Sequence, residues 1–338
     1  MADDKRNDLL NEEEESGSGQ GNKNALAYGL LQKAGVNTDG MSPRTAWDMV
    51  NQMHLMDRMQ KRKTAEEQES YDKGNQEAKN KGITLDTAVK KAKEFSNSVA
   101  LHSANIKATF DAVSSIKSIV DEYNLGKLDK VQTKKHCGRG IISALACANG
   151  GRVTISRDLL NNPGACYRSS VVDFAKNNKE RVAELQKTLE VMKPGTSLHA
   201  KVEKLLENAK EKTQYERHNV LYKGKEVESV MAHELGHTIA DQYFGQINEE
   251  KYLKSDISSS DARLYREKIL NAYKNALENG EIKKVSAYAA SDDAEFFAEC
   301  FCMHQMGEEK LPEGINNALK EVFTWIDHHK KAKETGKN

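Results

Sequence analysis

The sequence is poor in the residues that build a large apolar core. Aromatic residues make up 6% of its 338 positions, and it contains only 4 prolines and 2 tryptophans. Charged residues reach 30%, and polar residues are concentrated in roughly the first 80 positions. A segment with so few apolar side chains cannot offset the entropy that is lost on ordering, so we expect the packed part of the chain to follow it.

The sequence also lacks an excess of charge of either sign. Lysine plus arginine and aspartate plus glutamate both total 51, so no net field draws the chain to nucleic acid or to an anionic membrane surface. No apolar run reaches the roughly 20 residues that span a bilayer, and Met1 to Arg6 lead into no signal-peptide core. We expect a soluble protein without a nucleic-acid or membrane partner. Its compartment, cytoplasm or virion, is left open.

A disulfide framework is a third feature that the sequence lacks. An odd number of cysteines argues against the paired cysteines of small secreted proteins. None of them has the local signature of a cysteine peptidase. The pair Cys300-x-Cys302 on a helix would direct its thiols to different sides rather than to one metal. We expect reduced thiols at all five positions, which are Cys137, Cys147, Cys166, Cys300 and Cys302.

Composition divides the chain into four regions. Residues 1–23 contain the acidic run Glu12–Glu15 and a stretch of glycine and serine, which is typical of a disordered acidic tail. Residues 24–57 have the pattern of a small helical segment, a candidate docking site for a partner. Residues 58–82 have almost no apolar periodicity, as in a linker or a solvated helix extension. We expect the main domain at 83–333.

Hydrophobic periodicity predicts a helix-rich domain with a small sheet. Apolar residues recur at three- and four-residue steps from Thr84 to Val120, which predicts one or two amphipathic helices. The alternating run Arg152–Ser156, after a glycine pair, is the clearest strand. The fold class is therefore expected to be α+β. Further helices are expected from about Lys225 and over 169–192, 198–212, 259–279, 292–306 and 312–332.

The strongest chemical signal is the pentapeptide His233-Glu234-Leu235-Gly236-His237. Two imidazoles at i and i+4 share one face of a helix, so both can bind the same ion. Zinc lowers the pKa of a bound water, and a carboxylate beside it can take the proton. Apolar residues nearby indicate a helix that is buried beside a site. We expect Zn²⁺ bound by His233 and His237, with Glu234 as the catalytic base.

A catalytic zinc site needs a third protein ligand. After His237 the next histidine is His304, so we expect the third ligand to be a carboxylate. The segment 293–301 offers Glu295 and Glu299 at i and i+4 on one helical face, and its three phenylalanines would anchor that helix in a core. By spacing alone, either glutamate could be the ligand.

Together these motifs resemble the catalytic domain of the anthrax lethal factor-like zinc peptidases, a gluzincin group, over about residues 230–306. In that family a Ser-Tyr pair follows the histidine helix, and the ligand glutamate of a Glu-Phe-Phe-Ala-Glu segment comes seven residues after the tyrosine. Tyr288 and Glu295 stand at this interval, with one residue inserted between the serine and the tyrosine. The resemblance implies a zincin-like fold, His233, His237 and Glu295 as zinc ligands, and Tyr288 as hydrogen-bond donor to the oxyanion.

The resemblance also implies supporting carboxylates and an activity. Glu299 would accept the outer N–H of a ligand imidazole, and Asp241, one turn after His237, is a second candidate for that role. The implied reaction is hydrolysis of internal peptide bonds in a protein or peptide substrate. We expect the substrate strand to pair with residues 151–156 at the edge of the sheet.

Two other hypotheses are compatible with the sequence. The segment at 25–60 vaguely resembles parts of phage-associated and mobile-element proteins that carry such peptidase domains, so the chain could be a non-catalytic assembly protein that retains a zincin scaffold. Glu234 and Tyr288 favour chemistry, because a scaffold needs neither. Alternatively, cleavage within 58–82 could release an active C-terminal domain.

Overall fold

The computed structural model describes residues 27–29, 31–32, 37–38, 41–52, 55–102, 104–135, 137, 144–192, 194–244 and 259–334. The predicted disordered tail, residues 1–23, lies outside the described residues. The chain divides into two compact units, Met1–Gln68 and Glu69–Asn338. Each unit is described by itself.

The first unit contains the helical segment that was predicted within 24–57. Helix α3 (Pro43–Gln52) begins at the proline, whose missing N–H and fixed φ suit the first turn of a helix. A small apolar cluster holds this segment together, and the Tyr28 hydroxyl donates to the Met41 carbonyl over 2.7 Å. The fully buried members of the cluster are Ala27, Leu31, Ala46 and Val50.

Helix α4 (Leu55–Asn80) occupies most of the stretch expected to be a linker or a helix extension. Of these two alternatives, the structure shows the helix extension and not the linker. The last turns of α4 belong to the second unit, because the Asn105 amide donates to the Ser70 carbonyl over 3.0 Å and Ile106 N donates to Asn75 Oδ1 over 3.0 Å. The second unit therefore begins at Glu69 rather than at residue 83.

The second unit is α+β, as predicted, with a four-stranded sheet of order β1-β2-β4-β3. Strands β1 (Ser96–Ala100), β2 (Leu128–Lys134) and β4 (Arg152–Ser156) are parallel, whereas β3 (Ala146–Asn149) is antiparallel to β4. The predicted strand is β4, but the expectation that it forms the sheet edge is wrong. The glycine pair 150–151, at φ 55° and 76°, turns the chain tightly so that β3 pairs on the outside of β4.

The apolar pattern at 84–120 proves to contain a strand between two helices. Helix α5 (Leu85–Phe95) begins at the predicted cap Thr84, whose hydroxyl accepts from Thr87 N over 3.2 Å. The chain then enters β1, and α6 (Ile106–Glu122) follows. Strand β1 is fixed by its parallel pairing with β2, a contact that local periodicity does not encode.

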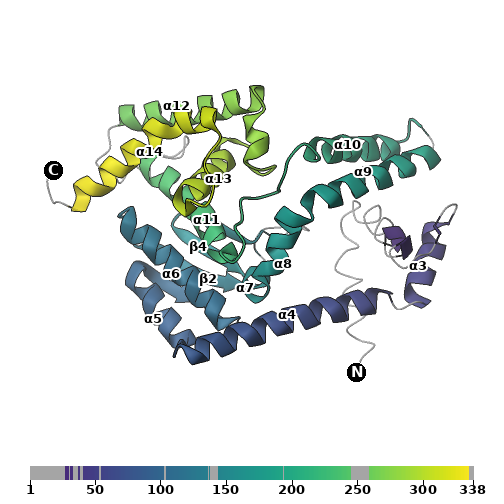
Figure 1. Ribbon diagram of the computed structural model, residues 1–338, viewed down its shortest axis with the longest axis horizontal. Helices are drawn as coiled ribbons and strands as arrows, with labels where there is room; N and C mark the ends of the chain where they lie inside the picture. Colours follow the sequence, from purple (N-terminus) through teal and green to yellow (C-terminus); the bar gives the residue numbers. More distant parts are fainter. Residues whose placement is uncertain are drawn as a thin grey trace. The chain divides into compact units, whose positions relative to one another are not determined.

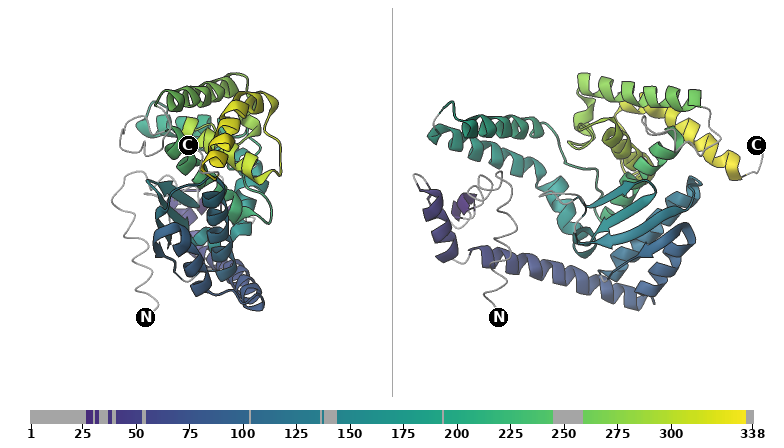
Figure 2. Two further views of the ribbon diagram at one scale, coloured as in Figure 1. Left: turned by 90° about the vertical axis from the view of Figure 1, so that its left-hand side faces the viewer. Right: turned by 180° about the vertical axis from the view of Figure 1, so that it is seen from behind.

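Helices α9 to α14 agree closely with the predicted helical ranges, whereas the short helices α7 and α8 and two short turns of helix were not predicted. A π-helical turn, Arg168–Val172, precedes α9, and a 3-10 turn, Glu281–Lys284, follows α12. The other helices are α7 (Arg157–Asn161), α8 (Pro163–Tyr167), α9 (Phe174–Val191), α10 (Ser197–Lys212), α11 (Glu226–Phe244), α12 (Ser259–Glu278), α13 (Asp293–Met306) and α14 (Glu313–Glu334). Figures 1 and 2 show α9 and α10 running side by side as a hairpin, and α5 and α6 along one face of the sheet.

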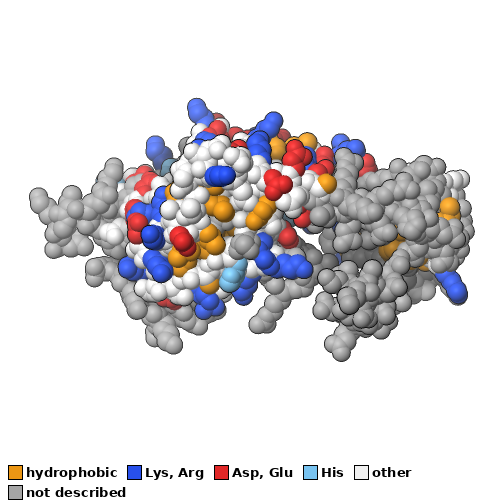
Figure 3. Space-filling view, turned by 90° about the horizontal axis from the view of Figure 1, so that it is seen from below, with side chains coloured by type: hydrophobic (Ala, Val, Ile, Leu, Met, Phe, Trp, Pro, Cys, Tyr) orange, Lys and Arg blue, Asp and Glu red, His pale blue; other side chains and the backbone are white. Residues whose placement is uncertain are grey.

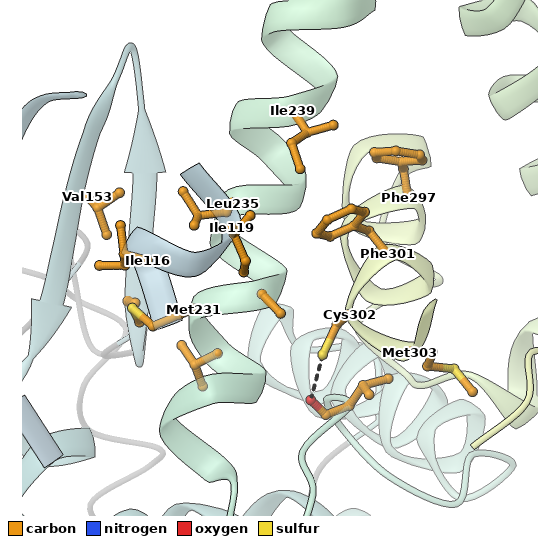
Figure 4. Packing of buried hydrophobic residues seen from close by; sticks show 14 of the residues in the cluster. Ile116, Ile119, Val153, Met231, Leu235, Ile239, Phe297, Phe301, Cys302 and Met303 are labelled. Carbon is orange, nitrogen blue, oxygen red and sulfur yellow. Dashed lines mark hydrogen bonds between the residues drawn. The ribbon is translucent and has the colours of Figure 1, made fainter. Parts of the chain in front are cut away.

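Helix α11 lies at the centre of the apolar core of the second unit. Figure 4 shows it between α6 and the sheet on one side and α13 on the other. The helix is buried on almost every side, so its position is fixed by packing rather than by one apolar stripe. The side chains packed there, from α11 and from its neighbours, include Ile116, Ile119, Val153, Met231, Leu235, Ile239, Phe297 and Phe301, all at most 2% exposed.

The surface reflects the balance of charge in the sequence. On the face seen in Figure 3, Lys and Arg side chains lie among Asp and Glu side chains. Among the described residues, no helix combines the length and the apolar character that a membrane crossing requires.

Candidate metal centre

The two imidazoles of the pentapeptide lie on one face of α11, as their spacing predicts. His233 Nε2 and His237 Nε2 are 3.3 Å apart, and the rings meet edge to face with centroids 5.0 Å apart. The His233 side chain is 10% exposed and that of His237 is 20% exposed. One turn of helix thus brings two nitrogen donors to one point at the rim of the core.

Helix α13 brings a carboxylate to the same point. Asp292 caps this helix by accepting from Glu295 N over 2.8 Å, which fixes Glu295 in the first turn. The two helices approach closely because position 236 is a glycine. A Cβ at Gly236 would lie 3.0 Å from the Ala298 Cα, so the close approach of α11 and α13 requires a residue without a side chain.

Three potential ligand atoms converge between the helices. Glu295 Oε2 lies 3.1 Å from His233 Nε2 and 3.2 Å from His237 Nε2. Nitrogen and oxygen atoms bound at about 2.0–2.1 Å around a tetrahedral zinc ion lie about 3.3 Å from one another, so the triangle has the size of a zinc site. Within the part of the chain that the structure describes, these are the residues grouped so that they could hold a metal ion.

One donor atom of the triangle lacks a hydrogen-bond partner. Glu295 Oε2 is buried and finds no hydrogen-bond partner among the described residues. A buried carboxylate oxygen without a partner is costly. A divalent cation between Glu295, His233 and His237 would satisfy it, so the residues present fit a zinc ion.

Glu299, the other glutamate on this face of α13, occupies a different position. Its Oε1 lies 2.8 Å from His233 Nδ1, on the far side of the ring from Glu295, and its Oε2 accepts from Val220 N over 2.6 Å. The residue is 1% exposed. The geometry therefore places Glu295 in the triangle of potential ligand atoms and Glu299 at the outer nitrogen of His233.

The electrostatics of this cluster join His233 to both carboxylates. Burial alone would lower the pKa of His233, but the adjacent carboxylates of Glu295 and Glu299 outweigh burial and raise this pKa well above 6.5. Burial would raise the pKa of Glu295, but His233 and His237 hold it far below its ordinary value. In the absence of a metal, both shifts favour an ion pair between a protonated His233 and an ionised Glu295.

Glu234 lies on α11 next to His233, and its carboxylate contacts strand β3. It is 7% exposed, and burial raises the pKa of its carboxyl group, while His233 and His237 act in the opposite direction. A backbone hydrogen bond from Ala148 on β3 favours its charged form. A buried carboxylate next to two imidazoles is suited to proton transfer near neutral pH.

Tyr288 lies beside the imidazole of His233, with ring centroids 5.7 Å apart. The turn that carries it is closed by Ser286, whose hydroxyl accepts from Ala289 N over 2.9 Å. Burial raises the pKa of the Tyr288 phenol, and the charge of Glu295, to which the phenol also donates a hydrogen bond, raises it further. The phenol therefore keeps its proton and can serve as a hydrogen-bond donor.

Arg217 and His218 hold the turn that carries Tyr288, and neither residue was recognised from the sequence. Tyr288 N donates to the His218 carbonyl over 2.9 Å, and the His218 ring lies 5.7 Å from the Tyr288 ring. Arg217 Nε donates to the Val285 carbonyl over 2.7 Å, and its NH2 group pairs with Glu309 over 2.6 Å. Both residues lie in an irregular segment that carries no periodic signal.

Asp241, predicted as a second partner for an imidazole, lies half-buried on α11 one turn after His237. Its role stays a prediction. All five cysteines carry thiols, as expected.

Comparison with known proteins finds no matching family model, no matching curated protein and no matching solved structure.

Proposed function

We propose that this chain is a zinc-dependent endopeptidase of the gluzincin type, with His233, His237 and Glu295 as ligands and Glu234 as the base. The observation that carries the proposal is the convergence of His233 Nε2, His237 Nε2 and Glu295 Oε2 to within 3.1–3.3 Å of one another. Three protein ligands with space for a fourth are typical of catalytic rather than structural zinc sites.

The zinc ion, when bound, would supply a Lewis acid that polarises a peptide carbonyl and makes a water more acidic. The protein's own groups would do the rest. Glu234 would take a proton from the attacking water and pass it to the leaving amine. The raised pKa of its carboxyl group suits both directions of transfer.

Tyr288 would stabilise the charge that develops on the carbonyl oxygen. Its phenol is held beside His233 and keeps its proton, so it can donate a hydrogen bond to the oxyanion. The main-chain bond from Tyr288 N to the His218 carbonyl fixes the residue before the substrate arrives. Such pre-organisation is what makes a hydrogen bond to a transition state effective.

Strand β3 is the expected place for the substrate backbone. It is the outermost described strand on this side of the sheet, and α11 packs against it. Its Ala148 contacts the base through a backbone hydrogen bond. An extended peptide that added to this edge would bring a peptide bond close to Glu234 and the ligand triangle.

Cleavage of a peptide library by the zinc-loaded protein, read by mass spectrometry, tests the proposal. We expect cuts by the wild type and none by Glu234→Gln, which keeps the shape and the metal ligands. Glu228→Gln, a half-buried change on the same helix, is the matched control and should cut normally. Zinc content is measured for each variant.

Each outcome separates the hypotheses. Cuts that persist in Glu234→Gln would show a contaminant or a different mechanism. A stoichiometric zinc content without any cut in the library or in a host lysate would favour a non-catalytic assembly protein. Cleavage of the chain within 58–82 by the wild type, but not by Glu234→Gln, would show self-processing.

A further inference from the structure

Two thiols outside the ligand triangle meet at one residue of the sheet. Cys147 lies on β3, where its Cα pairs directly with that of Thr154 on β4. Cys137 follows β2, and its Sγ lies 3.5 Å from the Thr154 carbonyl oxygen. Cysteines 10 positions apart in the sequence thus face the same point of strand β4.

Backbone hydrogen bonds hold both cysteines in this arrangement. Ala144 N donates to the Cys137 carbonyl over 3.0 Å, and Ser156 N donates to the Leu145 carbonyl over 2.9 Å. The Ser156 hydroxyl donates to the Lys135 carbonyl over 3.3 Å. Residues that precede the two thiols, Lys135 and Leu145, are therefore tied to the same residue at the end of β4.

The two thiols differ in accessibility. Cys147 is exposed, whereas Cys137 is 2% exposed. Burial raises the pKa of Cys137 to about 12, and the neighbouring Cys147 thiol contributes to the shift through its charge and a hydrogen bond. Because the thiolate is the reactive form and access limits oxidation, Cys147 should react first and Cys137 second.

We propose that Cys137 and Cys147 are an oxidisable pair whose disulfide fastens the segment after β2 to strand β3. A hydroperoxide would oxidise the Cys147 thiol to a sulfenic acid. The hydroperoxide itself would be reduced to an alcohol, or to water in the case of hydrogen peroxide. The Cys137 sulfur would then attack the Cys147 sulfur, which forms the S–S bond and releases one water. A thiol reductant would restore both thiols.

The cysteine pair lies next to the strand that flanks Glu234, so a disulfide would restrain that strand. Cys147 is the neighbour of Ala148, whose backbone contacts Glu234, and the charge of Glu234 also contributes to the raised pKa of Cys137. A disulfide here would tie the strand that flanks Glu234 to the segment after β2. The strand could then separate from β4 only together with that segment, so its amide hydrogens should exchange more slowly.

The test is a thiol count and a peptide map of the full chain, in which Cys166→Ser removes the half-buried cysteine that could form links between molecules. The reduced variant should show four reactive thiols after denaturation, and the peroxide-treated variant should show two. Trypsin, which cuts after Lys135, Arg139 and Arg152, should release His136–Arg139 joined to Gly140–Arg152 without reductant, and separately with it. Hydrogen exchange of the β3 peptide should slow after oxidation.

Cys147→Ser in the same background is the control, since an exposed serine is compatible with the fold. It should keep its three thiols under the same treatment and yield no joined peptide. The proposal is overturned if peroxide leaves Cys137 available to alkylation, with Cys147 oxidised to a sulfinic acid or linked to a second chain. None of these readouts depends on peptidase activity.

Discussion

At the scale of single residues, Glu299 is the carboxylate of the candidate metal centre that depends most on its polar partners. It is almost fully buried, and its two oxygens serve different partners, the His233 ring and the Val220 N–H. A buried carboxylate is stable only when such partners are present. We expect it to fix which His233 nitrogen carries the proton, so that the other would face a bound ion.

Replacement of this carboxylate should therefore weaken metal binding without removing a ligand. We expect Glu299→Gln to lower zinc affinity by about 10–100-fold, because a neutral amide is a poorer acceptor for the imidazole N–H. Competition with a chromophoric chelator measures the effect. Glu313→Gln, on the exposed first turn of α14, is the matched control. Equal affinities of the two variants would show that Glu299 only supports the fold.

The proton on His233 makes metal binding dependent on pH. Without metal, the two carboxylates hold the pKa of His233 well above 6.5, so the ring is charged at pH 7. Coordination requires the neutral ring, so binding must expel this proton, and affinity should fall as the pH is lowered. Calorimetry in buffers of different ionisation enthalpy should reveal the release of a proton from the wild type at pH 7. The absence of any buffer dependence would contradict the prediction.

The limits of sequence reasoning are clearest for the two glutamates. Their spacing placed both on one face of a helix, which the structure confirms, but could not decide which of them lies between the two imidazoles. That choice depends on how α13 is rotated and shifted against α11. The shift is set by contacts far apart in the sequence, such as Gly236 against Ala298.

At the scale of elements, the contact between α11 and α13 depends on glycine at position 236. Gly236→Ala would gain about 1 kcal/mol of helix propensity in isolation. In the protein the new Cβ would lie 3.0 Å from the Ala298 backbone and 3.3 Å from the Phe301 ring, so the helices must separate. We expect a net loss of about 1–3 kcal/mol of stability and weaker zinc binding, because Glu295 moves with α13.

Urea denaturation and the zinc competition assay would measure both effects. Gly126→Ala is the control, since a Cβ there meets no atom within 4 Å. A stabilised Gly236→Ala protein with unchanged zinc affinity would show that the helix contact can relax without cost to the site.

Helices were easier to predict than strands in this chain. The ranges of α10, α12, α13 and α14 follow from apolar periodicity, and the start of α10 also follows from the break at Pro194-Gly195. Strands β1, β2 and β3 were missed, because each is short and takes its stability from a neighbour rather than from its own residues. The antiparallel return of β3 also changed which strand lies at the edge.

At the scale of the whole molecule, the start of the second unit was predicted about 14 residues too late. The polar stretch from Glu69 to Asn80 has no apolar stripe, yet Ala78 is fully buried and two hydrogen bonds join this stretch to the start of α6. Polar contacts with so few apolar residues leave no pattern that periodicity can detect.

Truncation tests this boundary. We expect a fragment of residues 69–338 to keep the stability of the second unit. A fragment of residues 83–338 should lose about 2–3 kcal/mol, from two hydrogen bonds of about 1 kcal/mol each and the buried methyl of Ala78. Urea denaturation of the two fragments, monitored by circular dichroism, measures the difference. Equal midpoints would place the boundary near residue 83 after all.

Removal of the metal should destabilise the whole second unit. Zinc bound only by the folded state adds a free energy of RT ln(1 + [Zn]/Kd), about 4 kcal/mol at a thousandfold excess over Kd. The melting temperature of Glu234→Gln should therefore fall on addition of a chelator, and this variant excludes self-cleavage as the cause. His233→Ala should show a lower melting temperature that the chelator does not change further.

The separation of the ligands along the chain has a kinetic consequence. His237 and Glu295 stand 58 positions apart, and the triangle exists only after α11 and α13 have docked. A contact of such sequence separation tends to form late, after most of the barrier to folding has been crossed. An ion that recognises only the docked pair would then leave the refolding rate unchanged and slow unfolding. Zinc would set the lifetime of the native state rather than the speed of its formation.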